Sequence, residues 1–123
     1  MEGPRAVEVV DVVEAAQRLA DASAASRPLL VDVREAAEYA QFRAEGAVLL
    51  PLSTFLLSWG RLPADRPLLF ICATGRRSFG VADYLVRSGR RDVANVEGGT
   101  VAWARAGLPM RHGQPDPGEG ELP

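Results

Sequence analysis

The sequence contains a single cysteine, Cys72, and no lysine among its 123 residues. A lone cysteine cannot form a disulfide within the chain, so the fold does not depend on an oxidising compartment. All 14 basic residues are arginine, and the net charge is -2. A chain without an excess of positive charge does not attract nucleic acid or an anionic membrane surface, so we expect neither as a partner.

Long hydrophobic runs are also missing. No stretch approaches the roughly 20 apolar residues that span a bilayer. The N-terminal segment MEGPRAVEVVDVVEAAQR carries acidic residues where a secretory signal would be apolar. We therefore expect a soluble, cytoplasmic protein. Its length and its 47% hydrophobic content fit one domain with a single core.

Short apolar runs alternate with segments of helical period, which is the pattern of an α/β fold with a parallel sheet. Strands are predicted over residues 6–10, 28–33, 47–52, 68–72 and 92–96. Helices are predicted from Asp11 onward, over 34–43, from Ser53 to Trp59, from a Ser78 cap to Gly89, and over 100–107. Residues 1–110 form the predicted domain. The tail over 111–123 is rich in glycine, proline and acid, and we expect it to be mobile.

The stretch CATGRRS, residues 72–78, follows the most apolar predicted strand. Ligands bind beyond the carboxyl ends of parallel strands, and Cys72 lies at such an end. Gly75 is free to adopt a positive φ, so the turn can point successive amides inward as an anion-binding nest. The positive end of the following helix, together with Arg76 and Arg77, would stabilise a thiolate at Cys72.

Two other interpretations of this loop need consideration. A lone cysteine at the end of an apolar strand is usually a small buried hydrophobic residue, but such a residue has no need of a glycine and two arginines before a helix. Cysteine phosphatases place five residues between their cysteine and their arginine. Counted from Cys72, that arginine would be residue 78, which is Ser78. The shorter spacing predicts a cavity suited to one sulfur atom rather than to a phosphate.

Three separated motifs resemble those of the single-domain rhodaneses, which are sulfurtransferases. LLVDVREAAEY, LPADRPLLFICATGRRS and NVEGGTVAWARAGLP cover residues 29–39, 62–78 and 95–109. The resemblance implies a rhodanese-like α/β fold of three layers, with a central, five-stranded, mainly parallel sheet and helices on both faces. Where the family usually has G-H-I-P-G-A, this chain has FRAEGA over residues 42–47, which affects this turn and not the Cys72 loop.

The resemblance also assigns roles to residues. Cys72 is the nucleophile that becomes a persulfide, and the loop that surrounds it and binds substrate consists of Ala73, Thr74, Gly75, Arg76, Arg77 and Ser78. Asp32 and Arg34 match a pair that supports the loop from a neighbouring strand end. Their alternative role is structural: Asp32 would accept hydrogen bonds from loop amides, and Arg34 would pair with Glu38 one helical turn on.

The implied reaction moves a sulfane sulfur from a small anionic donor such as thiosulfate, through Cys72, to cyanide, a thiol or a protein acceptor. We expect no metal and no cofactor, because one cysteine and the distant His112 cannot assemble a metal site. Two alternatives stay open. The chain could be a persulfide carrier between proteins with poor thiosulfate turnover, or a non-catalytic interaction module. Retention of Cys72 in an intact loop argues against the module.

Overall fold

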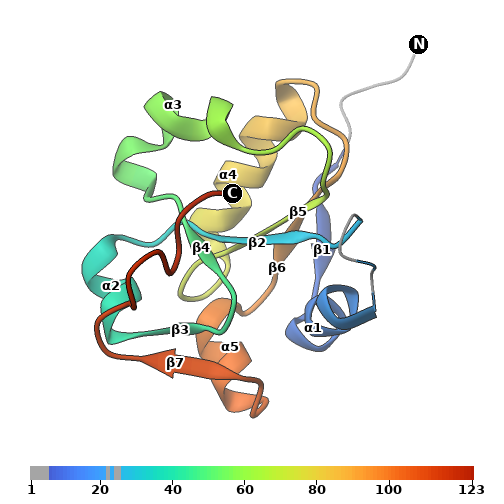
Figure 1. The fold of residues 1–123 in the computed structure, drawn as a ribbon. Coiled ribbons are helices and arrows are strands. Elements are labelled where there is room, and N and C mark those ends of the chain that lie inside the picture. The colour runs from blue at the N-terminus through green and yellow to red at the C-terminus, as the bar shows by residue number, and fades with distance from the viewer. Residues whose placement is uncertain (1–5, 22, 24–25) are drawn as a thin grey trace.

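The computed structural model describes residues 6–21, 23 and 26–123. Five parallel strands form the central sheet in the order β1-β6-β5-β2-β4 (Figure 1). The strands are β1 (Glu8–Val10), β2 (Leu29–Asp32), β4 (Val48–Leu49), β5 (Leu68–Ile71) and β6 (Val93–Val96). β5 lies in the middle of the sheet, with β2 and β6 as its neighbours.

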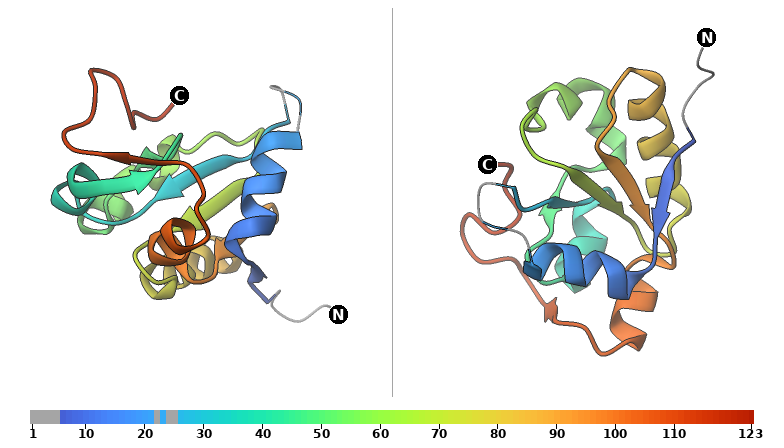
Figure 2. Two further views of the ribbon diagram at one scale, coloured as in Figure 1. Left: turned by 90° about the horizontal axis from the view of Figure 1, so that it is seen from below. Right: turned by 90° about the vertical axis from the view of Figure 1, so that its right-hand side faces the viewer.

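Helices cover both faces of this sheet (Figure 2). One face carries α3 (Phe55–Ser58), flanked by two short 3-10 turns (Leu52–Thr54 and Trp59–Arg61), and α4 (Arg76–Arg87). The other face carries α1 (Val12–Asp21), α2 (Ala36–Gln41) and α5 (Gly99–Arg105). This arrangement confirms the predicted three-layer α/β fold. No helix in the described part of the chain combines the length and apolar character needed to cross a membrane.

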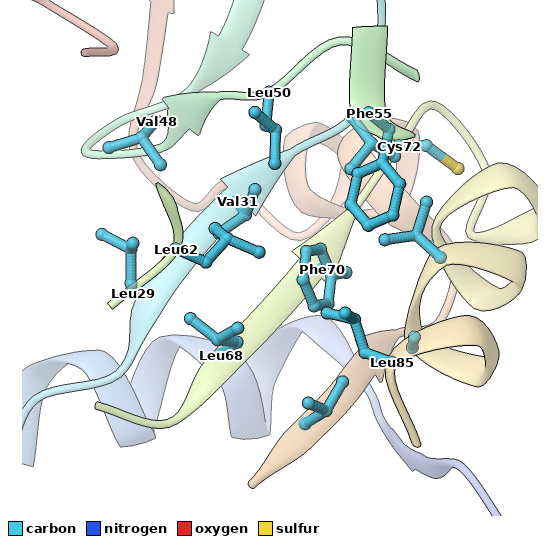
Figure 3. Close-up of a cluster of buried hydrophobic side chains, with 14 residues drawn as sticks. Leu29, Val31, Val48, Leu50, Phe55, Leu62, Leu68, Phe70, Cys72 and Leu85 are labelled. Carbon is cyan, nitrogen blue, oxygen red and sulfur yellow. The ribbon is translucent and has the colours of Figure 1, made fainter. Parts of the chain in front are cut away.

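The alternation of side chains along β5 divides the core into two clusters. Leu68 and Phe70 point to the face of α3 and α4, and Leu69 and Ile71 point to the opposite face. Cys72 continues the first series, so its side chain lies with Phe55 and Phe70 (Figure 3). The period of two along an apolar strand therefore decides on which face the sulfur lies.

The prediction of a helix over residues 34–43 is wrong at its end. α2 stops at Gln41, and residues Phe42–Ala44 form β3, which pairs antiparallel with β7 (Met110–His112) in a second, two-stranded sheet. The strand predicted over 47–52 is likewise reduced to β4. The first difference arises because the distant strand β7 pairs with residues 42–44, which sequence periodicity does not reveal. The second has a local cause, because β4 stops before Pro51 and a 3-10 turn begins at Leu52.

The C-terminal tail makes contacts that its composition did not predict. The guanidinium of Arg43, only 1% exposed, forms an ion pair with Glu119. The amide of Leu49 donates to the carbonyl of Gly120 at 2.8 Å, at the edge of β4, and Leu122 packs against the core cluster. The predicted domain boundary and the mobility of residues 111–123 stay predictions, and the Arg43–Glu119 pair provides a test of them.

Candidate active site

A tight turn joins the end of β5 to the first residue of α4. Gly75 precedes the helix in the left-handed conformation, with φ 95°. A Cβ atom there would lie 3.2 Å from the amide nitrogen of Gly98 and from the carbonyl oxygen of Val96. Both the backbone conformation and this close approach therefore call for glycine. The helix begins at Arg76, so the prediction that Ser78 caps it is wrong, and Ser78 lies inside the first turn.

The sulfur of Cys72 is surrounded by hydrogen-bond donors. The amide nitrogen of Gly75 lies 3.2 Å from Sγ, and the amide nitrogen and hydroxyl of Ser78 lie 3.4 and 3.3 Å from it. Cys72 is 1% exposed and Ser78 is fully buried. Donors fixed around a sulfur in a dry site favour the form of that sulfur that carries negative charge.

These donors decide the acidity of the thiol. Burial raises the pKa of Cys72, because a thiolate loses its hydration there. Hydrogen bonds from the Ser78 hydroxyl, and from the amides of Ser78, Thr74 and Gly75, lower the pKa and outweigh the burial. The net result is a pKa below that of an ordinary cysteine, which is the condition for a nucleophilic sulfur.

Asn95, a site residue that the sequence analysis missed, holds this loop from the end of β6. Its amide nitrogen donates to the carbonyl of Gly75 at 3.0 Å, and its carbonyl oxygen accepts from the Ser78 hydroxyl at 2.6 Å. Asn95 is 3% exposed. A polar side chain within the otherwise apolar strand VANV was the available signal, since buried polar groups require partners.

The first turn of α5 packs directly behind the cysteine. The amide and the hydroxyl of Thr100 donate to the carbonyl of Cys72 at 2.8 and 3.0 Å. A Cβ atom on Gly99 would overlap that carbonyl oxygen and lie 2.6 Å from the carbonyl oxygen of Ala73. Gly99 of the third motif thus lets α5 approach the loop closely, and the Thr100 hydrogen bonds fix the backbone that carries the sulfur.

The two loop arginines have different surroundings. Arg76 is exposed and has no ion-pair partner among the described residues. Arg77 forms a bidentate ion pair with Glu38 of α2, in which both nitrogen–oxygen distances are 2.8 Å. We expected both arginines to serve the substrate, but the charge of Arg77 is already balanced by a carboxylate.

Asp32 and Arg34 form a buried ion pair at the end of β2. The Arg34 guanidinium donates to the carboxylate of Asp32, with a shortest distance of 2.8 Å, and to the carbonyl of Phe42 at 2.7 Å. Their exposures are 0% and 2%. The structural roles considered from the sequence match these partners only in part. Asp32 accepts from the backbone amide of Arg34 at 2.9 Å as well as from its guanidinium, and Arg34 donates to the carbonyl of Glu38 at 3.4 Å rather than to its carboxylate. β2 does lie beside β5, with Asp32 in register with Ile71.

A surface hollow of about 390 Å³ adjoins the loop and is lined by Val9, Thr74, Gly75, Arg76, Phe79, Asn95 and Glu97. A larger hollow of about 520 Å³ lies beside α1 and includes no residue of the Cys72 loop. Within the described ranges, no three His, Cys, Asp or Glu side chains gather in a group suited to a metal ion.

Comparison with families of known proteins matches residues 12–106 to the rhodanese-like domain. The chain belongs to the rhodanese-like family. It is similar to a sulfurtransferase of Allochromatium vinosum, with 38% identity over 85% of this chain and 94% of that protein. It is also similar to the thiosulfate sulfurtransferase GlpE of Vibrio cholerae, with 36% identity over 66% of this chain and 76% of that protein.

The rhodanese fold is also evident from solved structures. The crystal structure of a rhodanese-related protein from Thermoplasma volcanium superposes with a TM-score of 0.72 at 23% identity, covering 85% of this chain and 97% of that one. At this identity the likeness shows the fold alone. The family and its curated sulfurtransferases together support sulfur transfer as the general activity of this rhodanese.

Proposed function

We propose that this rhodanese is a thiosulfate-type sulfurtransferase that carries a sulfane sulfur on Cys72. The observation that carries the proposal is the set of donors around the sulfur, in which the amides of Gly75 and Ser78 and the Ser78 hydroxyl lie 3.2 to 3.4 Å from Sγ. Donors in this position stabilise the thiolate before reaction and a persulfide anion after it. The similarity of this chain to a sulfurtransferase and to a thiosulfate sulfurtransferase supports the same chemistry.

In the first step, the Cys72 thiolate attacks the outer sulfur of thiosulfate. A bond forms between Sγ and that sulfur, the bond to the sulfonate breaks, and its electron pair leaves with sulfite. The product is a Cys72 persulfide anion whose charge lies close to the donors of the loop. The negative charge is conserved, so the step needs no oxidant and no proton.

In the second step, a nucleophile such as cyanide or a thiol takes the outer sulfur and releases the Cys72 thiolate. The chain has one cysteine, so the persulfide cannot be discharged by a second thiol of the same chain and must pass to an external acceptor. No metal or cofactor takes part in this scheme. We place the reaction in the cytoplasm, where reducing conditions keep a lone thiol free.

A persulfide carrier between proteins is the second candidate, and one observation favours it. Arg77 is paired with Glu38, so only part of the positive charge of the loop is available to an anionic small molecule. A protein donor would not depend on that charge. The interaction module is less favoured, because the loop retains both its cysteine and the donors that a persulfide needs.

Measuring turnover and loading with each sulfur donor distinguishes the enzyme, the carrier and the interaction module. The enzyme should produce thiocyanate from thiosulfate and cyanide, and the Cys72→Ser variant should produce none. A carrier would load only from a protein persulfide and would turn over thiosulfate poorly. Absence of loading from either donor would leave the interaction module, and hydrolysis of an aryl phosphate would support a phosphatase instead.

A further inference from the structure

The ion pair between Arg77 and Glu38 links the active-site loop to α2. Arg77 belongs to the first turn of α4, and Glu38 belongs to α2. The two side chains are 37% and 35% exposed, so the pair lies at the surface, where an incoming anion could compete with the carboxylate for the guanidinium. The pairing is bidentate, which fixes the plane of the guanidinium as well as its position.

Glu38 is itself held in place. Its carboxylate accepts a hydrogen bond from the amide of Glu35 at 3.1 Å. The carboxylate of Glu35 in turn accepts from the amide and hydroxyl of Ser53, at 3.1 and 2.6 Å. This series of contacts anchors the carboxylate that faces Arg77, so the guanidinium meets a fixed negative charge rather than a mobile one.

Both side chains of the pair are ionised at neutral pH, and the charge of Arg77 interacts with charge on Cys72. The Arg77 hydrogen bond, only partly opposed by burial, lowers the pKa of Glu38 to about 2. The Glu38 hydrogen bond raises the pKa of Arg77, and the negative charge of Cys72 raises it further. Arg77 directly precedes Ser78, whose amide donates to the sulfur at 3.4 Å, so its charge lies near the reacting atom while Glu38 balances it.

We propose that Glu38 is a specificity-determining residue that sets the preference of this site for the charge of the sulfur donor. By holding and neutralising Arg77, it weakens the attraction for a dianion such as thiosulfate more than the attraction for a singly charged thiosulfonate or persulfide. This inference rests on the proposed sulfur transfer through Cys72. Exposed Arg76 remains as the loop arginine that meets the donor in the wild-type protein.

The test compares two donors that transfer the same sulfur and differ in charge: thiosulfate, which is a dianion and leaves as sulfite, and methanethiosulfonate, which is a monoanion and leaves as methanesulfinate. Glu38→Gln keeps the side chain's size and its ability to accept from the Glu35 amide. We expect the ratio of kcat/KM for thiosulfate to that for methanethiosulfonate to rise about threefold to fivefold, the effect of one exposed charge interaction.

Glu35→Gln is the matched control, because it removes the same charge from the same helix start, while the backbone amide of residue 35 that holds Glu38 is unchanged and the new side-chain oxygen can still accept from Ser53. It should leave the donor ratio unchanged. In an Arg77→Gln background, Glu38→Gln should no longer raise the ratio, since there is no guanidinium to release. A ratio that does not change in Glu38→Gln, or that rises equally in Glu35→Gln, overturns the proposal.

A second measurement does not depend on sulfur transfer. Iodoacetate and iodoacetamide alkylate the same thiol and differ by one negative charge. Glu38→Gln should raise the rate with iodoacetate relative to that with iodoacetamide, and Glu35→Gln should not. If the wild-type protein transfers no sulfur but the alkylation ratio shifts, the proposed function fails and the role of Glu38 in charge selection stands. Normal transfer with both ratios unchanged refutes the role of Glu38 alone.

Discussion

The hydroxyl of Ser78 lies 2.6 Å from the carbonyl oxygen of Asn95 and 3.3 Å from the sulfur of Cys72. A hydroxyl has one hydrogen to donate, so these two acceptors compete for it. The shorter distance favours Asn95. The two amides of Gly75 and Ser78 then donate to the sulfur whatever the orientation of the hydroxyl, and Asn95 controls how much the hydroxyl adds to them.

Asn95→Ala should therefore lower the pKa of the Cys72 thiol. Without the Asn95 oxygen, the hydrogen of Ser78 turns to the sulfur and stabilises the thiolate, by about one pKa unit or less. The pKa is measured from the rate of alkylation by iodoacetamide against pH. In a Ser78→Ala background, Asn95→Ala should cause no such decrease, and a decrease there would show that the hydroxyl is not responsible.

Ser78→Ala alone should change the pKa in the opposite direction. The amide of residue 78 stays, but the hydroxyl that lowers the pKa of Cys72 is lost. We expect the pKa to rise by less than about one unit, because in the wild type the nearer Asn95 oxygen takes part of the hydroxyl's donation. Thr74→Ala is the control, because this exposed residue acts on the sulfur through its amide only. An equal rise in both variants would contradict the assignment.

Gly99→Ala should destabilise the protein and slow sulfur transfer together. The added Cβ would overlap the backbone carbonyls of Cys72 and Ala73, at a φ of +60° that disfavours alanine. We expect a loss of roughly 1–3 kcal/mol in the free energy of unfolding. Gly80→Ala is the matched substitution in α4, where a Cβ meets nothing within 4 Å. It should stabilise the protein by about 0.5–1 kcal/mol. Urea unfolding of both variants checks the contrast, and equal effects would contradict it.

Glu119→Gln should weaken the attachment of the C-terminal tail in a pH-dependent way. The Arg43 hydrogen bond lowers the pKa of Glu119 to about 2 from an ordinary value of 4.5. A lowered pKa means that the pair stabilises the fold fully above about pH 4.5 and loses this contribution as the pH falls towards 2. At neutral pH we expect the substitution to cost about 1–2 kcal/mol, because buried Arg43 loses its ionic partner.

The measurement is urea unfolding of wild type and Glu119→Gln across this range, with Glu121→Gln as the control for an exposed acid in the same tail. The difference between wild type and Glu119→Gln should shrink as the pH falls. A difference that is absent at neutral pH, together with rapid proteolysis of residues 111–123 in the wild type, would show that the tail is mobile as its composition predicts.

The parts of the fold that depend on local pattern were predicted from the sequence. The apolar run ending at Ile71 is β5, Gly89 has a positive φ just after α4 as expected of a C-terminal cap, and the amide of Glu14 donates to the carboxylate of Asp11 at the start of α1. The position of Cys72 at a strand end and the need for glycine at residue 75 followed from the same reasoning. Each depends on residues close together in the chain.

The features that were missed depend on residues far apart in the chain. Arg43 reads as the end of an amphipathic helix, but β3 forms there because β7 pairs with it. Glu38 matches its motif, yet no spacing rule pairs it with Arg77, 39 residues away. Asn95 could have been noticed as a polar residue in an apolar strand, but its two partners in the Cys72 loop could not have been named from the sequence.

The most direct measurement of the central claim is the intact mass of the protein after incubation with thiosulfate, followed by fragmentation to locate the added mass. The account predicts the gain of one sulfur atom on Cys72, its loss on addition of cyanide, and no gain in Cys72→Ser. An unmodified wild-type protein, or an equal gain in Cys72→Ser, would contradict it.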